Sequence, residues 1–205
     1  MNASGGKVRR EMAGVRRFTE DEVLDQAEAL FRRKGYDATT MIDIAQASGV
    51  QRGSLYNAFG DKEEVFVRAF ARYRARFLLD MRRHLAQSDV RGGLLAFFAA
   101  AIANMTTGGQ GAGCFSTRTA TQGESAGPRI QAEVRDFLDA LEEILREACA
   151  RAGADCRLAL PPGEAARLLL TFTRGLAVME RVHGDRASLE ASARALVDLL
   201  VPAAT

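Results

Sequence analysis

Two helix-start signals near the N-terminal end, followed by a glycine turn, constrain this chain more than any other feature. Thr19 is followed three residues later by Glu22, and Thr40 by Asp43. In this pattern each threonine caps the helix that follows and is capped in return by the third helical residue. Apolar residues then recur at helical spacing, and Ser-Gly-Val at residues 48–50 indicates a tight turn before a third short helix. Two short helices joined by a glycine-containing turn form the helix-turn-helix pattern.

The rest of the chain also shows helical patterns, and no segment has a convincing strand pattern. We predict a helix over residues 20–34 ended by Gly35, the short second helix, a third over 51–58 and a fourth opened by Asp61. Further helices are expected over 94–105, from the Gly-Cys-Phe at 113–115, over 135–152, from the Pro-Pro at 161–162, and over 189–200. The prediction is an all-α protein of about nine helices.

Composition excludes several classes of protein. A hydrophobic content of 47% is enough for a real core, and a net charge of +2 is too small to imply nucleic-acid binding by itself. No apolar run is long enough to cross a bilayer and the first residues do not form a signal peptide, so we expect a cytoplasmic protein without a membrane partner. Three cysteines without a C-x-x-C spacing predict free thiols, no metal site and no cofactor.

The third helix is unusually polar for its position between packed helices. If Leu55 and Phe59 pack inward, Gly53 and Asn57 point most directly away from the core. Such a helix suits a DNA major groove, because Arg and Asn read base edges, hydroxyls bind phosphates and glycine permits close approach. On periodicity alone, an ordinary amphipathic surface helix is the alternative.

Residues 18–66, FTEDEVLDQAEALFRRKGYDATTMIDIAQASGVQRGSLYNAFGDKEEVF, strongly resemble the DNA-binding domain of the tetracycline-repressor (TetR) family. The resemblance lies in the KGY turn, the TT cap, the IA…GV helix, the LY-x-x-F helix and the following DKEE, and it covers about a quarter of the chain. It implies an all-helical, homodimeric transcription regulator, usually a repressor of a palindromic operator that a small molecule releases. It also implies a helix-turn-helix DNA-binding domain (18–61) and a ligand-binding and dimerisation domain (62–205). Residues 1–17 carry five basic residues against one acid, which indicates a flexible basic arm, although an ordinary solubilising tail explains them equally well.

The same resemblance assigns roles to residues of the head. Thr40 and Tyr56 match phosphate contacts, Lys62 a DNA-backbone contact, and Arg52, Gly53 and Asn57 base-facing positions. Asn57 departs from the His or Tyr common there, which leaves the operator sequence open. The predicted DNA-contacting residues are Thr40, Gln51, Arg52, Gly53, Ser54, Tyr56, Asn57 and Lys62.

The body is expected to bind an effector and to form the dimer. The last two helices carry more apolar surface than one small body needs to cover, in agreement with the family's pairing through them. Apolar and aromatic residues of the body predict an effector pocket, although core packing explains the same residues. The predicted pocket residues are Phe97, Phe98, Met105, Cys114, Phe115, Phe137, Phe172 and Met179.

The segment Gly113-Cys114-Phe115 resembles the GC[FL] signature of a TetR subgroup, some of whose members sense through a cysteine. A helix start and Arg118 would both lower the pKa of the Cys114 thiol, which gives a second hypothesis, an electrophile- or redox-sensing repressor. A buried structural cysteine is the simpler reading.

Two other classes of function stay open at this point. A Cys114–His84 or Cys114–His183 pair oriented by Glu124 would suit an enzyme, but no catalytic motif accompanies these residues and we predict no enzyme. A helical interaction module that binds partners through residues 161–205, without DNA, is the remaining alternative.

Overall fold

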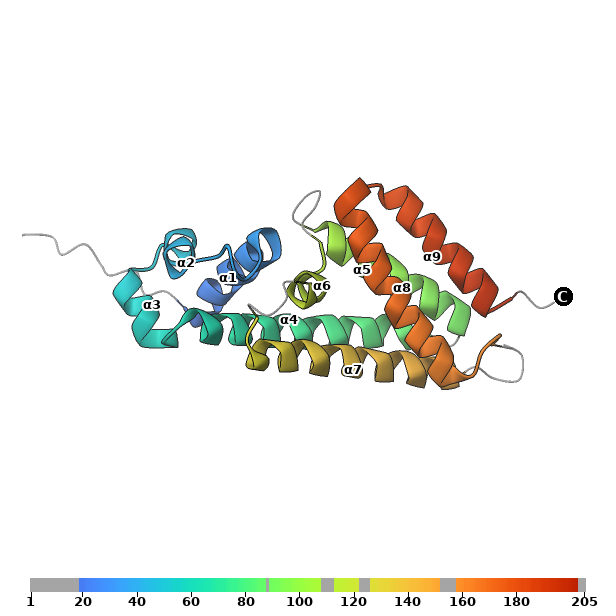
Figure 1. Cartoon of the computed structure of the whole chain (residues 1–205). Coiled ribbons are helices and arrows are strands. Elements are labelled where there is room, and N and C mark those ends of the chain that lie inside the picture. Colours follow the sequence, from blue (N-terminus) through green and yellow to red (C-terminus); the bar gives the residue numbers. More distant parts are fainter. Residues whose placement is uncertain (1–18, 88, 108–112, 122–125, 152–157, 203–205) are drawn as a thin grey trace, which may run out of the picture.

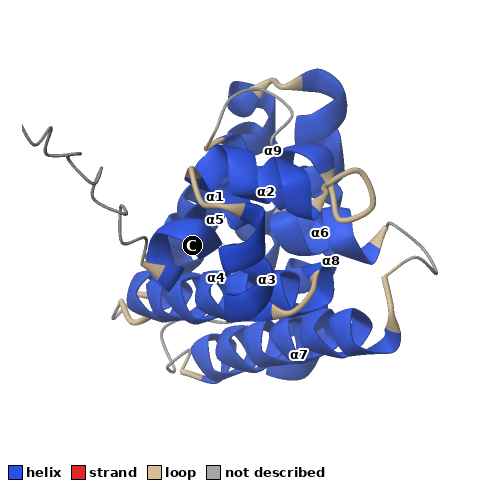
Figure 2. Ribbon diagram, turned by 90° about the vertical axis from the view of Figure 1, so that its left-hand side faces the viewer, coloured by secondary structure: helices blue, strands red, loops and turns tan. Residues whose placement is uncertain are grey.

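The computed structural model describes residues 19–87, 89–107, 113–121, 126–151 and 158–202, and every regular element in these ranges is an α-helix (Figure 2). The predicted all-α class with about nine helices is confirmed for this part of the chain. The basic arm, the glycine-rich residues 108–112, Glu124 and Cys156 lie outside the described residues. The helices are α1 (Glu20–Lys34), α2 (Met41–Ser48), α3 (Arg52–Phe59), α4 (Lys62–Leu85), α5 (Val90–Thr106), α6 (Phe115–Ala120), α7 (Pro128–Ala150), α8 (Pro162–His183) and α9 (Arg186–Leu200).

Local capping explains where the first helices begin and end. Thr19 and Thr40 both form the predicted reciprocal capping boxes, with Glu22 and Asp43. Gly49 ends α2 in the left-handed conformation at φ 68°, which a glycine adopts without a steric penalty. The two boxes and the glycine turn therefore fix α1, α2 and α3 at the boundaries that the sequence predicts, to within a residue or two.

The helices form a small head and a larger body joined by α4 (Figure 1). The head consists of α1–α3, and α4 runs from it along the length of the body beside α7. In the body, α8 packs on α7, while α9 packs mainly on α5. The body therefore reaches the head chiefly through α4 and through the short helix α6, which contacts α1.

A cluster of aromatic rings fills the junction between head and body. Phe115 of α6 is its central member, with ring centroids 5.3 Å from Phe66, 5.1 Å from Phe70 and 5.4 Å from Tyr73, all on α4. It also stacks at 6.5 Å on Phe31 of α1, and each of these side chains is at most 2% exposed. Edge-to-face and stacked rings at such distances add to the gain from burial. We call these five residues the junction cluster.

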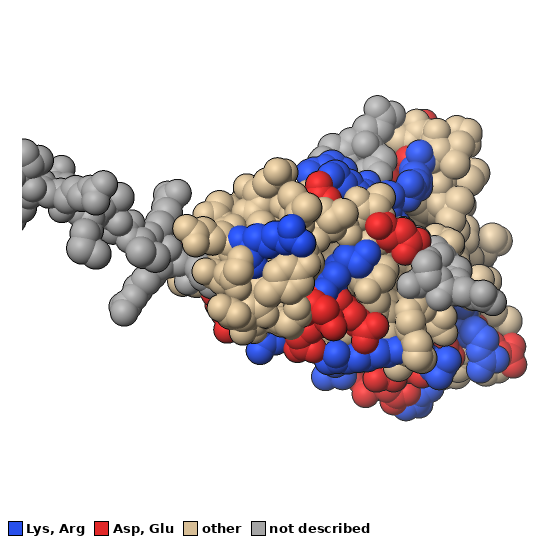
Figure 3. All heavy atoms as spheres, turned by 60° about the vertical axis from the view of Figure 1, so that its left-hand side comes forward, with Lys and Arg blue, Asp and Glu red and all other residues tan. Residues whose placement is uncertain are grey.

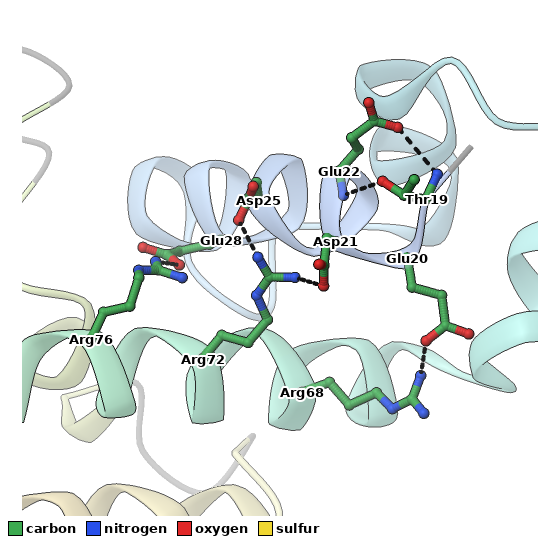
Figure 4. A network of polar contacts seen from close by, with 9 residues as sticks. All are labelled: Thr19, Glu20, Asp21, Glu22, Asp25, Glu28, Arg68, Arg72 and Arg76. Atoms are coloured by element: carbon green, nitrogen blue, oxygen red, sulfur yellow. Dashed lines mark hydrogen bonds and ion pairs between the residues drawn. The ribbon is translucent and has the colours of Figure 1, made fainter. Parts of the chain in front are cut away.

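A ladder of ion pairs holds α1 against α4 on the outside (Figure 4). Arg68, Arg72 and Arg76, each four residues apart on α4, pair with acidic residues along α1. The pairs are Arg68–Glu20 (2.9 Å), Arg72–Asp21, Arg72–Asp25 (3.1 Å) and Arg76–Glu28 (2.6 Å). Because exposed pairs contribute little free energy each, the ladder fixes orientation more than stability.

The helices α5, α7 and α9 begin earlier than the sequence indicates, and the difference is largest for α7. We predicted a helix from residue 135, whereas α7 begins at Pro128. Proline is favoured at the first helical position, and Ile130 and Val134 continue the buried stripe of the helix toward its start. Arg129 pairs with Glu64 at 2.8 Å, so these first turns also contact α4 near the head.

We expect Phe115→Ala to lower the free energy of unfolding by about 3–5 kcal/mol, because it removes a fully buried ring and leaves a cavity. Chemical denaturation followed by circular dichroism measures the change. Leu79→Ala is the control: Leu79 is 52% exposed, so its loss should change stability by about 0.5 kcal/mol or less. Equal effects of the two substitutions would contradict the role assigned to the junction cluster.

Candidate functional site

The exposed face of α3 gathers most of the residues predicted to contact DNA. Leu55 and Phe59 point into the head and are at most 4% exposed. The opposite face presents exposed residues and the half-buried Ser54; the exposed ones are Gln51, Arg52, Gly53, Tyr56 and Asn57. A Cβ added at Gly53 would meet no atom within 4 Å, so the backbone itself is open to a partner there. At this end of the molecule, basic side chains stand on a largely uncharged surface (Figure 3).

The side chains of this face are only loosely tied to the protein. The Arg52 guanidinium lies 5.6 Å from the centre of the Tyr56 ring, one turn along α3. None of the described ion pairs includes Arg52. A guanidinium held only by a ring face keeps its donors available for a second molecule.

Thr40 lies at the start of α2, with its hydroxyl engaged in the cap. The hydroxyl donates to Asp43 Oδ2 at 2.7 Å and accepts from the Asp43 backbone N–H at 3.1 Å. Lys34 Nζ donates to Asp43 Oδ1 at 2.7 Å, and this bond together with those from Thr40 holds the pKa of Asp43 well below its usual range. Thr40 is exposed, so its position suits a phosphate at the positive end of α2.

Lys62 has an internal partner that the sequence did not reveal. Its Nζ donates to the Tyr36 backbone oxygen at 3.0 Å and lies 4.1 Å from the centre of the Tyr36 ring. This contact uses one of three ammonium hydrogens and ties the Lys-Gly-Tyr turn to the start of α4. The remaining two hydrogens are what Lys62 can offer to DNA.

The eight residues predicted to form an effector pocket do not surround one cavity in the described part of the chain. Five are core residues, at most 2% exposed: Phe97, Phe98, Met105, Phe115 and Phe137. Phe172 and Met179 line a groove of about 720 Å³ between α8 and α9. Cys114 lines a separate cavity of about 370 Å³ between α6 and α8.

Cys114 caps the start of α6 and is 3% exposed. Its Sγ lies 3.1 Å from Ser116 Oγ and 3.5 Å from Nη1 of Arg174, which reaches across from α8. The same Nη1 donates to Ser116 Oγ at 2.7 Å. Burial opposes ionisation of the thiol, but the charge of Arg174 and the hydrogen bonds from Ser116 and Thr117 more than offset it and lower the pKa to about 7.

The sequence prediction named Arg118 as the cation beside Cys114, whereas the structure places Arg174 there. Arg174 is 60 residues away along the chain, so no local pattern signals the contact. Neither His84 nor His183 is among the groups that contact Cys114, and the imidazole of His84 instead lies 3.6 Å from Asp80. No group of three or more candidate metal ligands occurs among the described residues.

Comparison with known proteins identifies the head. Residues 23–69 match the family model described as bacterial regulatory proteins of the tetR family. Residues 23–69 are therefore similar to the DNA-binding domain of the TetR family. The family model and the matched relatives are those of transcriptional regulators.

Two curated TetR-family relatives match in sequence. The transcriptional repressor ComR of Escherichia coli is 34% identical over 106 residues, which are 51% of this chain and 50% of that protein. The biofilm-operon negative regulator IcaR of Staphylococcus epidermidis is 40% identical over 47 residues, 23% of this chain and 25% of that protein. The chain thus spans half or less of the length of these relatives.

Solved structures share the fold of nearly the whole chain. A cysteine variant of the TetR-family regulator CifR, in complex with a 26-bp operator DNA, has a TM-score of 0.81 at 23% identity, covering 90% of this chain and 98% of that one. The reduced form of Escherichia coli NemR has a TM-score of 0.79 at 17% identity, covering 90% and 99%. In the described part of the chain, no helix is long and apolar enough to cross a membrane.

We expect the alkylation rate of Cys114 to rise through pH 7, since its thiolate forms near that pH. Cys149 should stay unreactive, because burial raises the pKa of its thiol to about 11. Arg174→Gln should raise the Cys114 pKa, because burial then acts with less opposition. Mass spectrometry of iodoacetamide-labelled peptides across pH 5–10 gives both values. Arg167→Gln, on the same helix but 73% exposed, is the control, and an unchanged Cys114 profile in Arg174→Gln would disprove the pairing.

Proposed function

We propose that this protein is a transcriptional repressor that binds a palindromic DNA operator as a homodimer and is released by a small-molecule effector. The observation that carries the proposal is the exposed face of α3, where Arg52, Gly53 and Asn57 stand clear of the head. A helix with an available guanidinium, an amide and an open glycine fits the major groove. CifR, which shares this fold, has been solved with operator DNA, and ComR is named a repressor. Action on DNA agrees with the expected cytoplasmic location.

The contacts of the head divide into two kinds in this proposal. Arg52 and Asn57 read base edges, because both are exposed on α3 and their guanidinium and amide groups match the hydrogen-bonding edges of bases. Thr40, Tyr56 and Lys62 bind phosphates and fix the position of the head, with Gln51 and Ser54 as further polar contacts. The Lys62–Tyr36 bond lets this lysine position the turn and the DNA backbone together.

An exposed apolar face on the last two helices supports the homodimer. Leu168 and Met179 of α8 and Leu199 of α9 are 39–75% exposed. A Cβ added at Gly175, on the same side of α8, would meet nothing within 4 Å, so a partner helix can approach closely there. A two-fold pairing through this face presents two α3 helices to half-sites on one face of the DNA.

We expect Arg52→Ala and Asn57→Ala to reduce discrimination at one operator position by about 1–3 kcal/mol, since each removes a base-edge contact. Tyr56→Phe should instead weaken binding to all operator variants alike, because it removes a phosphate contact only. Binding curves across a set of single-base operator variants make the distinction. Arg146→Ala, an exposed arginine on α7, is the control and should bind as the unmodified protein does.

Two results would refute this reading of the α3 face. One is full base discrimination in both the Arg52→Ala and Asn57→Ala proteins. The other is the absence of any salt-dependent shift of the adjacent promoter DNA by the unmodified protein, which would favour the interaction-module alternative.

We expect Met179→Asp to convert the dimer to a monomer, because the substitution places an unpaired charge in the proposed interface. Met179 is 49% exposed in the single chain, so the fold of the monomer should tolerate the change. Leu176 is a poor test position because it is only 3% exposed within one chain. Sedimentation equilibrium at micromolar concentration measures the assembly, with Leu79→Asp on α4 as the control. If Met179→Asp and Leu199→Asp both remain dimeric, the interface lies elsewhere.

A thiol-based release is the second candidate, and the lowered pKa of Cys114 favours it. A thiolate is the nucleophile in reactions with electrophiles and oxidants. Modification of a side chain that is 3% exposed adds bulk directly before Phe115 and the junction cluster. Cys114→Ser should then remain on DNA under mild electrophile treatment that releases the unmodified protein, and normal release of the Ser variant would assign the thiol a structural role.

A further inference from the structure

The cavity between α6 and α8 has two unlike walls. One part is lined by Thr117 and Arg118 of α6, by Thr121 directly after that helix, and by Arg181 of α8. Ala177, Val178 and Val182 of α8 form an apolar part beside them. Its volume of about 370 Å³ falls at the small end of the range for ligand pockets, which suits a molecule of few non-hydrogen atoms.

Within the described residues, no acid forms an ion pair with the arginines of this cavity. Burial lowers the pKa of Arg118, and the positive charge of Arg181 lowers it further, so the two guanidinium groups repel each other. Nε of Arg118 is buried without a hydrogen-bond partner, as are Nε and Nη2 of the neighbouring Arg174. Among the described residues none of these three arginines forms an ion pair, in contrast to the arginines of the ladder on α4.

Such an arrangement is unfavourable unless an anion completes it. Like charges close together destabilise the fold, and a buried unsatisfied donor costs about 1–3 kcal/mol. The planar guanidinium presents paired donors whose spacing matches the two oxygens of a carboxylate. The apolar wall formed by Val178 and Val182 adds a surface that a bare inorganic ion would leave uncovered.

We infer that the α6–α8 cavity binds a small organic carboxylate, with its carboxylate between Arg118 and Arg181 and its apolar part against Val178 and Val182. This inference rests on the proposed function, since it names the chemical class of the effector. It places the effector beside Cys114, which lines the same cavity, rather than among the core aromatic residues of the body.

The occupant of this cavity has two short routes to the DNA-binding head. Phe115, next to Cys114, stacks on Phe31 of α1 as part of the junction cluster. Gly113, which lines the cavity, offers its carbonyl oxygen to Nη2 of Arg32 at 3.4 Å, and the same nitrogen donates to the Asn104 carbonyl oxygen. A ligand that shifts α6 toward its carboxylate therefore moves groups that contact α1 directly.

The test uses benzoate as the probe and benzamide as its uncharged analogue of the same shape. Benzoate should bind the full-length protein in isothermal titration calorimetry. The affinity for benzamide should be lower by roughly tenfold or more, since benzamide forms no charge-assisted hydrogen bonds. Arg118→Gln and Arg181→Gln should each weaken benzoate by a similar factor. Arg181 is exposed, so its substitution leaves the fold intact. Because Arg181→Gln removes the repulsion between Arg118 and Arg181, it should also raise the melting temperature of the ligand-free protein. Arg167→Gln is the control and should bind benzoate normally.

The inference is overturned if benzoate does not bind at about 10 mM, which corresponds to a binding free energy weaker than about −3 kcal/mol. It is also overturned if benzoate and benzamide bind equally, or if Arg118→Gln and Arg181→Gln both bind benzoate normally. Loss of dimerisation in Arg118→Gln and Arg181→Gln would likewise overturn it, because the arginines would then meet carboxylates of a second copy. DNA binding by the ligand-free protein is measured separately, in a gel-shift assay. If benzoate binds as expected but no DNA shifts, the proposed function fails while the carboxylate site stands.

Discussion

The packing of Phe115 against α1 and α4 is the contact on which the arrangement of head and body depends. Three short helices cannot form a stable unit alone, so the head completes its core with rings from α4 and from α6. Because protein interiors are close-packed, a displaced ring at this junction has no free space to enter. A movement of α6 therefore also displaces the helices packed against it. The positions of body and head are coupled through this packing.

Charge is distributed differently on the two sides of this junction. Outside, Arg68, Arg72 and Arg76 of α4 are each matched with acids of α1, which orients the helices at little gain in free energy. Beside α6, Arg174 contacts the Cys114 thiol, and Arg118, Arg174 and Arg181 form no ion pair within the described residues. Uncompensated charge of this kind reduces stability, and proteins commonly retain such groups where they serve binding. The contrast separates a structural use of arginine from a functional one within a single small protein.

The sequence predicted the head well because its signals are local. Capping boxes, a glycine turn and the spacing of Leu55 and Phe59 act within a few residues of each other, and they determine both the helix boundaries and the exposed face of α3. Contacts between distant segments were not predictable in this way. Arg174 beside Cys114, Lys62 on the Tyr36 carbonyl and the pairing of α1 with α4 depend on how helices pack. The proposed pocket of aromatic residues failed to assemble for the same reason, since hydrophobicity alone does not distinguish a core from the wall of a cavity.

Because α4 is long, a small tilt of this helix produces a large displacement of the head. At about 1.5 Å per residue, its 24 residues span about 36 Å without interruption. The ladder binds α1 to the part of this helix between Arg68 and Arg76, while at the far end Arg151 donates to the Leu85 carbonyl oxygen at 2.8 Å. A tilt of about 5° around that far end displaces the start of α4 by about 3 Å, close to the rise of about 3.4 Å between successive base pairs. An angular change too small to disturb the core is thus enough to carry α3 from one base pair to the next.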